Sequence, residues 1–220
     1  MKKIIKNIII LISYLFYKLA IILALYLLGI DYTSFDLKKK MVTTLIMNVI
    51  YIIIIVFLYR KELLEDLKDF KVNYKKYISK NIIIYLLGIL LMFIVNIIIS
   101  KITNQSLSGN EIRIREYIKE YPLFVVFSAI IYSPLIEELI FRKSIRNIFK
   151  NRYLFIIISG LIFGLLHITD PTDINEILYS IPYILMGIDF AYIYYKTNNI
   201  FTTITFHFCH NLILLIIQLI

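Results

Sequence analysis

The sequence has a single cysteine, few acidic residues and no long polar stretch. Cys209 stands alone inside an apolar run, so no disulfide framework can form within the chain. Only 15 Asp and Glu oppose 24 Lys and Arg, which gives a formal net charge of +9. Such an excess would suit nucleic acid only on a soluble basic face with interleaved aromatic residues. No soluble stretch is long enough to supply that face, so we expect no nucleic-acid partner.

The composition instead indicates a protein that is embedded in a lipid bilayer. Hydrophobic residues make up 60% of the chain and the mean hydropathy is +0.81, whereas soluble domains average about 45–50% apolar residues. We therefore predict a multi-pass protein of the cell membrane. The richness in Ile, Lys, Asn and Tyr suggests an AT-rich prokaryotic genome.

Seven apolar segments approach the length of about 20 residues that crosses a membrane as a helix. The predicted fold is an all-α transmembrane bundle of about seven helices, with an eighth split or re-entrant segment left open. The fifth segment is short for a full span. The expected segments cover roughly residues 8–30, 41–59, 81–102, 123–150, 154–167, 177–195 and 200–220.

The polar stretch 103–110 divides the chain into two predicted parts. Residues 1–110 hold three membrane helices with little buried chemistry, and residues 111–220 hold nearly all the intramembrane polar groups. Lys2, Lys3 and Lys6 resemble the start of a signal peptide. The apolar run after them is too long and no small-residue cleavage site follows, so we expect a first spanning helix.

The distribution of charge predicts the orientation. With the N-terminus inside, the cytoplasmic segments contain sixteen Lys or Arg and the outer segments contain seven. Residues 60–80, expected as a short amphipathic or extended cytoplasmic segment, and residues 142–152 supply most of the inner charge. The positive-inside rule therefore favours an internal N-terminus and, with seven spans, an external C-terminus.

Two adjacent carboxylates, Glu137 and Glu138, lie within an apolar run. Ionised groups inside a membrane cost several kcal/mol, so they are candidates for function. On a helix Glu138 and Arg142 share a face and can pair, while Glu137 points about 100° away. Pro134 can bend the helix just before them. A charged turn at the membrane surface is the alternative interpretation.

Two histidine motifs follow the carboxylates. Phe163 and His167 lie on one helix face, and Gly160 and Gly164 allow close approach of a neighbouring helix. His207 and Asn211 also share a face. At 1.5 Å per residue, Glu137, His167, His207 and Asn211 fall at similar heights, in the cytoplasmic half or the middle of one bilayer.

Together these motifs resemble the CPBP family. This group contains intramembrane endopeptidases related to the CAAX prenyl protease Rce1 and to bacteriocin-processing and self-immunity proteins. The resemblance covers about residues 120–215, and the strings EELIFR, IFGLLH and YYKTNNI are similar in context. The matching motifs are EExxxR (Glu137, Glu138, Arg142), FxxxH (Phe163, His167) and HxxxN (His207, Asn211).

The resemblance implies a role for each matched residue. Glu137 and His167 would bind and activate the hydrolytic water, and His207 and Asn211 would stabilise the oxyanion of the tetrahedral intermediate. Glu138 and Arg142, with Phe163, would support the site. These roles agree with carboxylate or imidazole acting as a general base and with donors aimed at developing negative charge.

Metal dependence stays open at this stage. The family is often labelled metalloprotease, and Glu137, His167 and His207 could make a three-ligand Zn²⁺ site. The same residues suit activation of water without a metal, and spacing cannot separate the two accounts because the residues come from three helices. We favour the account that requires no cofactor.

Other polar residues fit no motif position. His210 is three residues from His207, and Asp189 lies in the sixth span, where it would pair with Lys18 or line the cavity. Cys209 points about 200° away from His207 around the helix, which disfavours a cysteine protease.

The resulting hypothesis is an intramembrane endopeptidase that cleaves a peptide or a membrane-protein segment entering from the cytoplasmic side. One alternative is a bacteriocin self-immunity or scaffold protein with little or no turnover. Another is a small transporter whose carboxylates and histidines relay protons. Loss of the phenotype in an inserted Glu137→Ala variant would favour the enzyme over the scaffold, and proton-coupled flux would favour the transporter.

Overall fold

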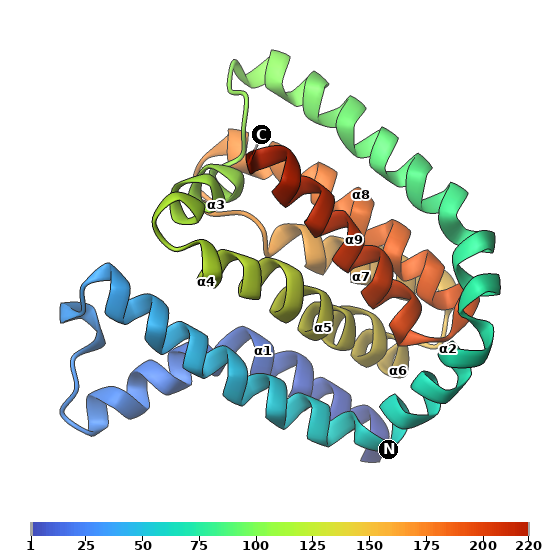
Figure 1. Cartoon of the computed structure of the whole chain (residues 1–220), viewed down its shortest axis with the longest axis horizontal. Coiled ribbons are helices and arrows are strands. Elements are labelled where there is room, and N and C mark those ends of the chain that lie inside the picture. Colours follow the sequence, from blue (N-terminus) through green and yellow to red (C-terminus); the bar gives the residue numbers. More distant parts are fainter. Residues whose placement is uncertain (1, 220) are drawn as a thin grey trace.

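The computed structural model describes residues 2–219 as a bundle of helices (Figure 1). Five of the helical stretches are long and apolar enough to cross a membrane, and Arg152–Leu165 is a shorter apolar helix. The predicted all-α class is confirmed, although the seventh segment was expected to reach Ile220, which lies outside the described residues. The helices are α1 (Lys2–Leu27), α2 (Leu37–Thr103), α3 (Gly109–Glu120), α4 (Pro122–Val126), α5 (Ser133–Glu137), α6 (Ile145–Ile148), α7 (Arg152–Leu165), α8 (Ile174–Thr197) and α9 (Ile200–Leu219).

α2 contains both the second and the third predicted spans. The sequence predicted a separate amphipathic or extended segment over residues 60–80, but the helix continues through it without a break. Figure 1 shows that α2 changes direction in its middle part, so its two apolar halves cover different sides of the bundle. Asp36 caps its first turn by accepting from the backbone of Lys39, and Asn104 ends it in the left-handed conformation. We call residues 60–80 the basic bend.

A single long helix, Pro122–Ile148, carries the two glutamates. We call it the composite helix, because α4, α5 and α6 alternate with two π-helical segments, Phe127–Tyr132 and Glu138–Ser144. Its continuity confirms the predicted fourth span. π-helical turns are rare and occur often at functional sites, since the extra residue changes the direction of the side chains that follow.

Glycines allow α7 and α8 to pack at very short distance. A Cβ added at Gly160 would lie 2.9 Å from the backbone nitrogen of Ile188, and one at Gly164 would lie 2.6 Å from that of Ile184. The predicted small-residue ridge is thus the contact surface with the next helix. It fixes the end of α7, where His167 follows.

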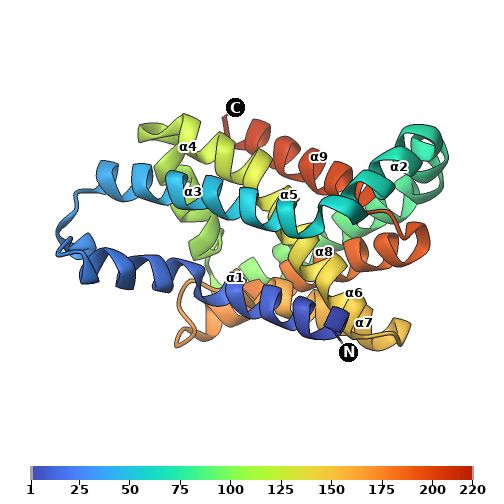
Figure 2. The same cartoon turned by 90° about the horizontal axis from the view of Figure 1, so that it is seen from below.

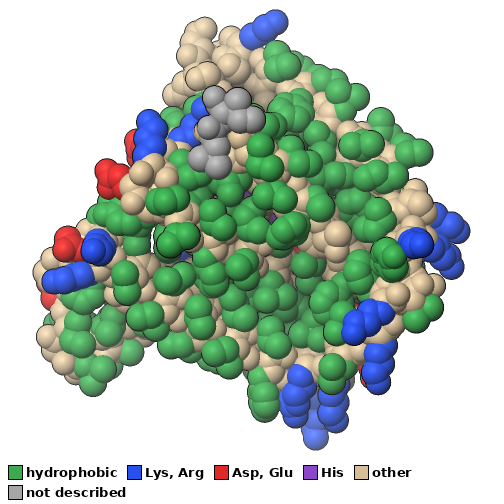
Figure 3. All heavy atoms as spheres, in the orientation of Figure 1, with side chains coloured by type: hydrophobic (Ala, Val, Ile, Leu, Met, Phe, Trp, Pro, Cys, Tyr) green, Lys and Arg blue, Asp and Glu red, His purple; other side chains and the backbone are tan. Residues whose placement is uncertain are grey.

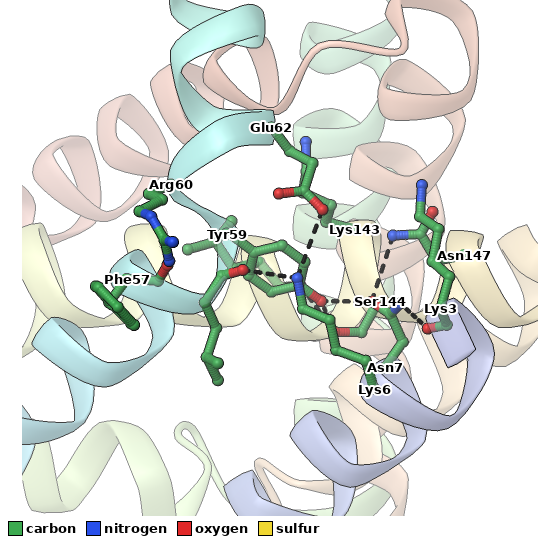
Figure 4. A network of polar contacts seen from close by, with 12 residues as sticks. Lys3, Lys6, Asn7, Phe57, Tyr59, Arg60, Glu62, Lys143, Ser144 and Asn147 are labelled. Carbon is green, nitrogen blue, oxygen red and sulfur yellow. Dashed lines mark hydrogen bonds and ion pairs between the residues drawn. The ribbon is translucent and has the colours of Figure 1, made fainter.

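A buried polar network closes the bundle at the end that holds the basic bend (Figure 4). The hydroxyl of Tyr59 donates to Asn7 Oδ1 at 2.5 Å and lies 2.6 Å from Ser144 Oγ. Asn147 donates to Asn7 as well, and the Lys143 ammonium pairs with Asp66. These contacts join α1, α2 and the composite helix, so the inner end of the glutamate-bearing helix is held on two sides.

Charge and hydrophobic side chains occupy different zones of the surface. Figure 3 shows hydrophobic side chains across the middle of one face, with Lys and Arg at its right and lower margins and, beside Asp and Glu, at its left margin. α1 and both halves of α2 expose many large apolar side chains, for example Ile53 at 62% and Ile83 at 67%. In water such a surface would drive association, whereas in a bilayer it is the surface that faces lipid.

Candidate active site

The four residues predicted to be catalytic line one cavity. Glu137, His167, His207 and Asn211 all border a hollow of about 590 Å³ in the centre of the bundle. They come from the composite helix, from the turn after α7 and from α9. The structure therefore brings three motifs that are distant in sequence to one place. The volume lies within the range of about 300–1,000 Å³ that is usual for ligand sites.

The two glutamates have different surroundings. Glu138 and Arg142 are fully buried, and Glu138 Oε2 lies 3.1 Å from Arg142 Nε. The Arg142 guanidinium also lies over the Phe163 ring at 4.5 Å from its centroid. Glu137 borders the cavity, and its Oε2 has no hydrogen-bond partner. The helical separation predicted from the sequence thus places one carboxylate in an ion pair and leaves the other directed at the cavity.

His207 lies between both carboxylates. Its Nδ1 is 2.8 Å from Glu138 Oε1, and its Nε2 is 4.0 Å from Glu137 Oε2. An ionised carboxylate only accepts hydrogen bonds, so Nδ1 carries a proton and donates it to Glu138. Nε2 consequently faces Glu137 and the cavity. Phe190 stacks on the imidazole, with the ring centroids 5.1 Å apart, and holds its plane.

His167 is oriented in a similar way by a backbone group. Its Nδ1 lies 2.8 Å from the carbonyl oxygen of Phe163, which can only accept, so Nδ1–H is the donor. The unprotonated Nε2 is then free to accept a proton or a hydrogen bond. The ring is stacked against Tyr183, with centroids 4.4 Å apart and planes 15° from parallel.

Asn211 joins α9 to the composite helix. Its Nδ2 donates to the carbonyl oxygen of Ala129 at 2.7 Å. Ala129 lies within the π-helical segment Phe127–Tyr132, where the shifted backbone pattern makes carbonyl groups available to side chains. One amide hydrogen is used in this contact. Since Asn211 also borders the cavity, its second amide hydrogen remains for a ligand.

Sequence reasoning did not find the aromatic residues that hold the two histidines. Tyr183 and Phe190 lie in α8, which carries no motif, and they contact His167 and His207 through their ring faces. Their only signal in the sequence is an aromatic side chain in an apolar helix. Aromatic residues are common in such helices, so that signal could not separate them from ordinary core residues.

The side chains that the structure describes around the cavity are not arranged as a metal site. In residues 2–219, no group of three or more His, Cys, Asp or Glu side chains is placed to hold a metal ion. Glu137, His167 and His207 therefore do not fit a three-ligand zinc site as the structure positions them. His207 Nδ1 and His167 Nδ1 are both engaged by protein acceptors, which leaves one nitrogen on each ring.

The polar residues outside the motifs lie in different places. Lys18 and His210 border the cavity. Asp189 faces the other half of α2, because a Cβ added at Gly88 would lie 2.9 Å from the Asp189 Cγ. The ion pairs found within residues 2–219 do not join Asp189 to Lys18, and Asp189 is not part of the cavity wall. Cys209 borders no part of the cavity either.

The chain is similar to one family model and to several bacterial proteins. Residues 119–213 match the family model described as type II CAAX prenyl endopeptidase Rce1-like. The putative membrane peptidase YdiL of Bacillus subtilis (strain 168) is 35% identical over 115 residues, which are 51% of this chain and 44% of that protein. The membrane-embedded CAAX protease MroQ of Staphylococcus aureus (strain USA300) is 30% identical over 148 residues, which are 61% of this chain and 57% of MroQ.

A third relative, the UPF0177 protein YvdC of Lactococcus lactis subsp. lactis (strain IL1403), is 32% identical over 157 residues. That match covers 68% of this chain and 57% of YvdC. The chain thus spans about half the length of the curated relatives it matches. No solved structure matches it significantly. The apolar helices and these bacterial relatives identify a multi-pass membrane protein.

Proposed function

We propose that the chain is an intramembrane endopeptidase, because residues 119–213 match the Rce1-like CAAX prenyl endopeptidase family model. It hydrolyses peptide bonds in a peptide or in a segment of a membrane protein. The observation that carries the proposal is that the two neighbouring glutamates have different surroundings. Glu137 is part of the cavity wall, whereas Glu138 is fully buried behind it, against Arg142 and His207.

Glu137 and His167 activate the hydrolytic water in this proposal. The Glu137 carboxylate, which borders the cavity, accepts a hydrogen bond from the water and takes its proton during attack on the scissile carbonyl. His167 contributes Nε2, the nitrogen left free by the Phe163 contact, as a second acceptor that orients the same water. The proton then passes to the leaving amine, which restores the carboxylate.

His207 and Asn211 stabilise the tetrahedral intermediate. Asn211 donates its second amide hydrogen to the oxyanion, and the contact with Ala129 fixes the plane of the amide beforehand. His207 is oriented by the contact between its Nδ1 and Glu138, and it donates to the oxyanion from Nε2 when the ring carries a proton on both nitrogens. Such preorganised donors cost no reorganisation at the moment of reaction, which is the main source of their catalytic effect.

The mechanism as proposed needs no metal ion. The nucleophile is activated by a carboxylate and an imidazole, and the charge of the intermediate is met by two side-chain donors. Glu138 and Arg142 neutralise each other, so the fixed charge near the oxyanion is small.

The test uses purified protein in lipid nanodiscs and a library of quenched fluorogenic peptides, with cleavage products identified by mass spectrometry. The wild-type chain should produce defined cleavage products, and Glu137→Gln should produce none while remaining monodisperse. Lys75→Gln, on the exposed basic bend, is the matched control for a change of charge away from the cavity. Equal cleavage by wild type and Glu137→Gln would remove the proposal and leave a non-catalytic scaffold.

A further inference from the structure

The cavity is closed toward the end of the bundle that carries the basic bend. All seven residues of the π-helical segment Glu138–Ser144 are buried. Tyr59, Phe155 and Ser159 lie beside this segment and have no exposed surface. A second, smaller hollow of about 170 Å³ lies on the basic side, among residues such as Lys3, Glu62 and Lys143. It shares no lining residue with the cavity at Glu137, so a buried layer separates the two.

Toward the opposite end the cavity wall continues to the ends of the helices. Thr44 lies two turns into α2 and Asn96 two turns before its end. Gln218 lies in the last turn of α9, and the wall also includes Ser108, the N-cap of α3. Figures 1 and 2 both show α3 and the end of α9 on the side of the molecule away from the middle of α2. The cavity therefore extends from Glu137 toward the side opposite the basic bend.

The distribution of Lys and Arg indicates which end of the bundle faces the cytoplasm. The basic bend, the N-terminal lysines and the region after the composite helix lie together at the closed end, and they hold most of the Lys and Arg of the chain. Cytoplasmic segments carry that excess in membrane proteins. The closed end is consequently cytoplasmic, and the cavity opens toward the outer face.

The outer part of the cavity is suited to a peptide backbone. Carboxamide groups recur along its wall, each able to donate and to accept a hydrogen bond. Between them lie apolar side chains such as Phe93 and Leu214 that can contact side chains of a bound segment. Arg115 pairs with Glu111 at 2.9 Å, while its Nε is buried without a partner. The carboxamides are those of Asn48, Asn96, Asn110, Asn211 and Gln218.

We propose that the site receives its substrate from the extracytoplasmic side, as an extended peptide segment that is already exposed on the outer face of the membrane. This inference rests on the proposed peptidase function and specifies the substrate by its location. It differs from the cytoplasmic access expected from the sequence. The depths of the residues along their helices predicted that they could meet, and they do border one cavity, but depth does not show which end of a cavity is open.

Thiol labelling tests the direction of access without a substrate. Cys209→Ala gives a chain without cysteine, to which Asn96→Cys is added inside the cavity. Ile97→Cys, its neighbour at the same depth, is 57% exposed on the outside of the bundle and serves as the lipid-facing control. Val72→Cys, 81% exposed on the basic bend, marks the cytoplasmic side. The probe is a charged, membrane-impermeant maleimide, applied to intact cells and to inside-out vesicles.

Asn96→Cys should react in intact cells and at least about tenfold more slowly in inside-out vesicles. Ile97→Cys should react in neither, because the reactive thiolate does not form in hydrocarbon. Val72→Cys should react only in inside-out vesicles. Reaction of Asn96→Cys mainly from the vesicle side, equally from both sides, or from neither side would overturn the inference. Met92→Cys, one turn deeper in the same wall, repeats the measurement if Asn96→Cys does not insert.

Access and catalysis can be separated within the same experiment. The labelling is repeated with Glu137→Gln added, which removes the proposed base and leaves the cavity wall otherwise unchanged. Outer labelling that persists in this variant supports the direction of access, whatever the peptide library shows. Absence of peptide cleavage by the wild-type chain, together with normal outer labelling, would contradict the proposed chemistry alone.

Discussion

Glu137 and Glu138 are neighbours in the sequence, yet their carboxylates make different contacts. Glu138 is fully buried against Arg142 and His207, whereas Glu137 is part of the cavity wall. Removing one partner of a buried ion pair leaves the other charge uncompensated, which costs about 3–5 kcal/mol. We therefore expect Glu138→Gln to lose both stability and activity. Glu137→Gln should lose activity and keep a melting temperature close to that of wild type.

These different roles of the two glutamates can be checked by measuring thermal unfolding in nanodiscs and peptide cleavage on the same preparations. Arg142→Gln is the matched variant, because it strands Glu138 instead and should melt as early as Glu138→Gln. Equal losses of melting temperature in Glu137→Gln and Glu138→Gln would contradict the assignment of one carboxylate to chemistry and the other to support.

Asn211 has a structural contact as well as a predicted catalytic one. An oxyanion donor acts mainly in the transition state, and removing one typically lowers kcat about 10²–10³-fold. We expect Asn211→Ala to lower kcat by this order and to change KM only a few-fold. The lost contact with Ala129 should also reduce the melting temperature. Asn211→Asp should be at least as damaging, since it places negative charge against the oxyanion.

Steady-state kinetics on monodisperse protein separate the two contributions of Asn211. The carbonyl of Ala129 loses its partner in either variant, so the structural effect appears in the melting curve of both. A near-normal kcat in the folded fraction of Asn211→Ala would show that the residue only joins the two helices.

Whether the activity depends on a metal ion can be measured directly. If water is activated without a metal, dialysis against a strong chelator should leave activity within a factor of about two, whereas loss of a catalytic metal removes several kcal/mol of transition-state stabilisation. Elemental analysis of the same sample gives the zinc content per chain. Stoichiometric zinc, with activity lost on chelation and restored by addition of zinc, would contradict the metal-free mechanism.

At the scale of single helices, the position of His167 depends on two glycines. A Cβ at Gly164 would lie 2.6 Å from the backbone nitrogen of Ile184, which cannot move without moving α8. Overpacking of this kind typically costs about 1–3 kcal/mol. We expect Gly164→Ala to destabilise the protein and to reduce kcat, because the end of α7 must shift away from the cavity. Melting temperature and kcat are the two measurements.

Leu161→Ala is the matched control for Gly164→Ala. Leu161 lies one turn earlier on α7 and is 41% exposed, so its truncation leaves the contact between α7 and α8 in place. It should change the melting temperature little and leave kcat unaltered. An unchanged kcat in Gly164→Ala would mean that His167 does not depend on the close packing of α7.

The sequence predicts some elements well because the relevant physics is local. The spacing of Glu138 and Arg142 specifies their ion pair, and Gly160 and Gly164 specify the close face of α7. The uninterrupted helix through the basic bend was not predicted, because its charged residues fit an exposed segment as well as a helix that extends beyond the membrane. Its conformation depends on distant contacts, such as the hydrogen bond from Asn199 Nδ2 to the carbonyl oxygen of Asp66.

The detailed contacts within the site could not be predicted from the sequence. The stacking of Tyr183 on His167 and the contact of His207 with Glu138 join residues from helices that are far apart in the chain. Both π-helical segments change which way the side chains of the composite helix point, and no residue pattern predicts them. The motifs therefore identify the members of the site, while their hydrogen-bond partners follow only from the packing of whole helices.

The predicted orientation of the whole molecule does not change when buried basic residues are left out of the charge count. Arg142 and Lys143 are buried, at 0% and 5% exposure, so they do not act as surface charges. Removing both from the sixteen inner Lys and Arg leaves fourteen, against seven on the outer side. The inner segments therefore still carry twice as many Lys and Arg as the outer segments, and such an excess is typical of cytoplasmic segments. The loop between α7 and α8 holds Asp170 and Asp173 without any Lys or Arg, which fits the outer side.

This orientation predicts which loops an impermeant thiol reagent can reach. In the Cys209→Ala background, Pro171→Cys in the exposed loop before α8 should react in intact cells, because that loop lies outside. Lys75→Cys in the basic bend should react only after the membrane is opened or inverted. Both positions are free of long-range hydrogen bonds among those found, so neither change should disturb insertion. The reverse pattern would place the basic end outside, against the positive-inside rule, and would turn the mouth of the cavity toward the cytoplasm.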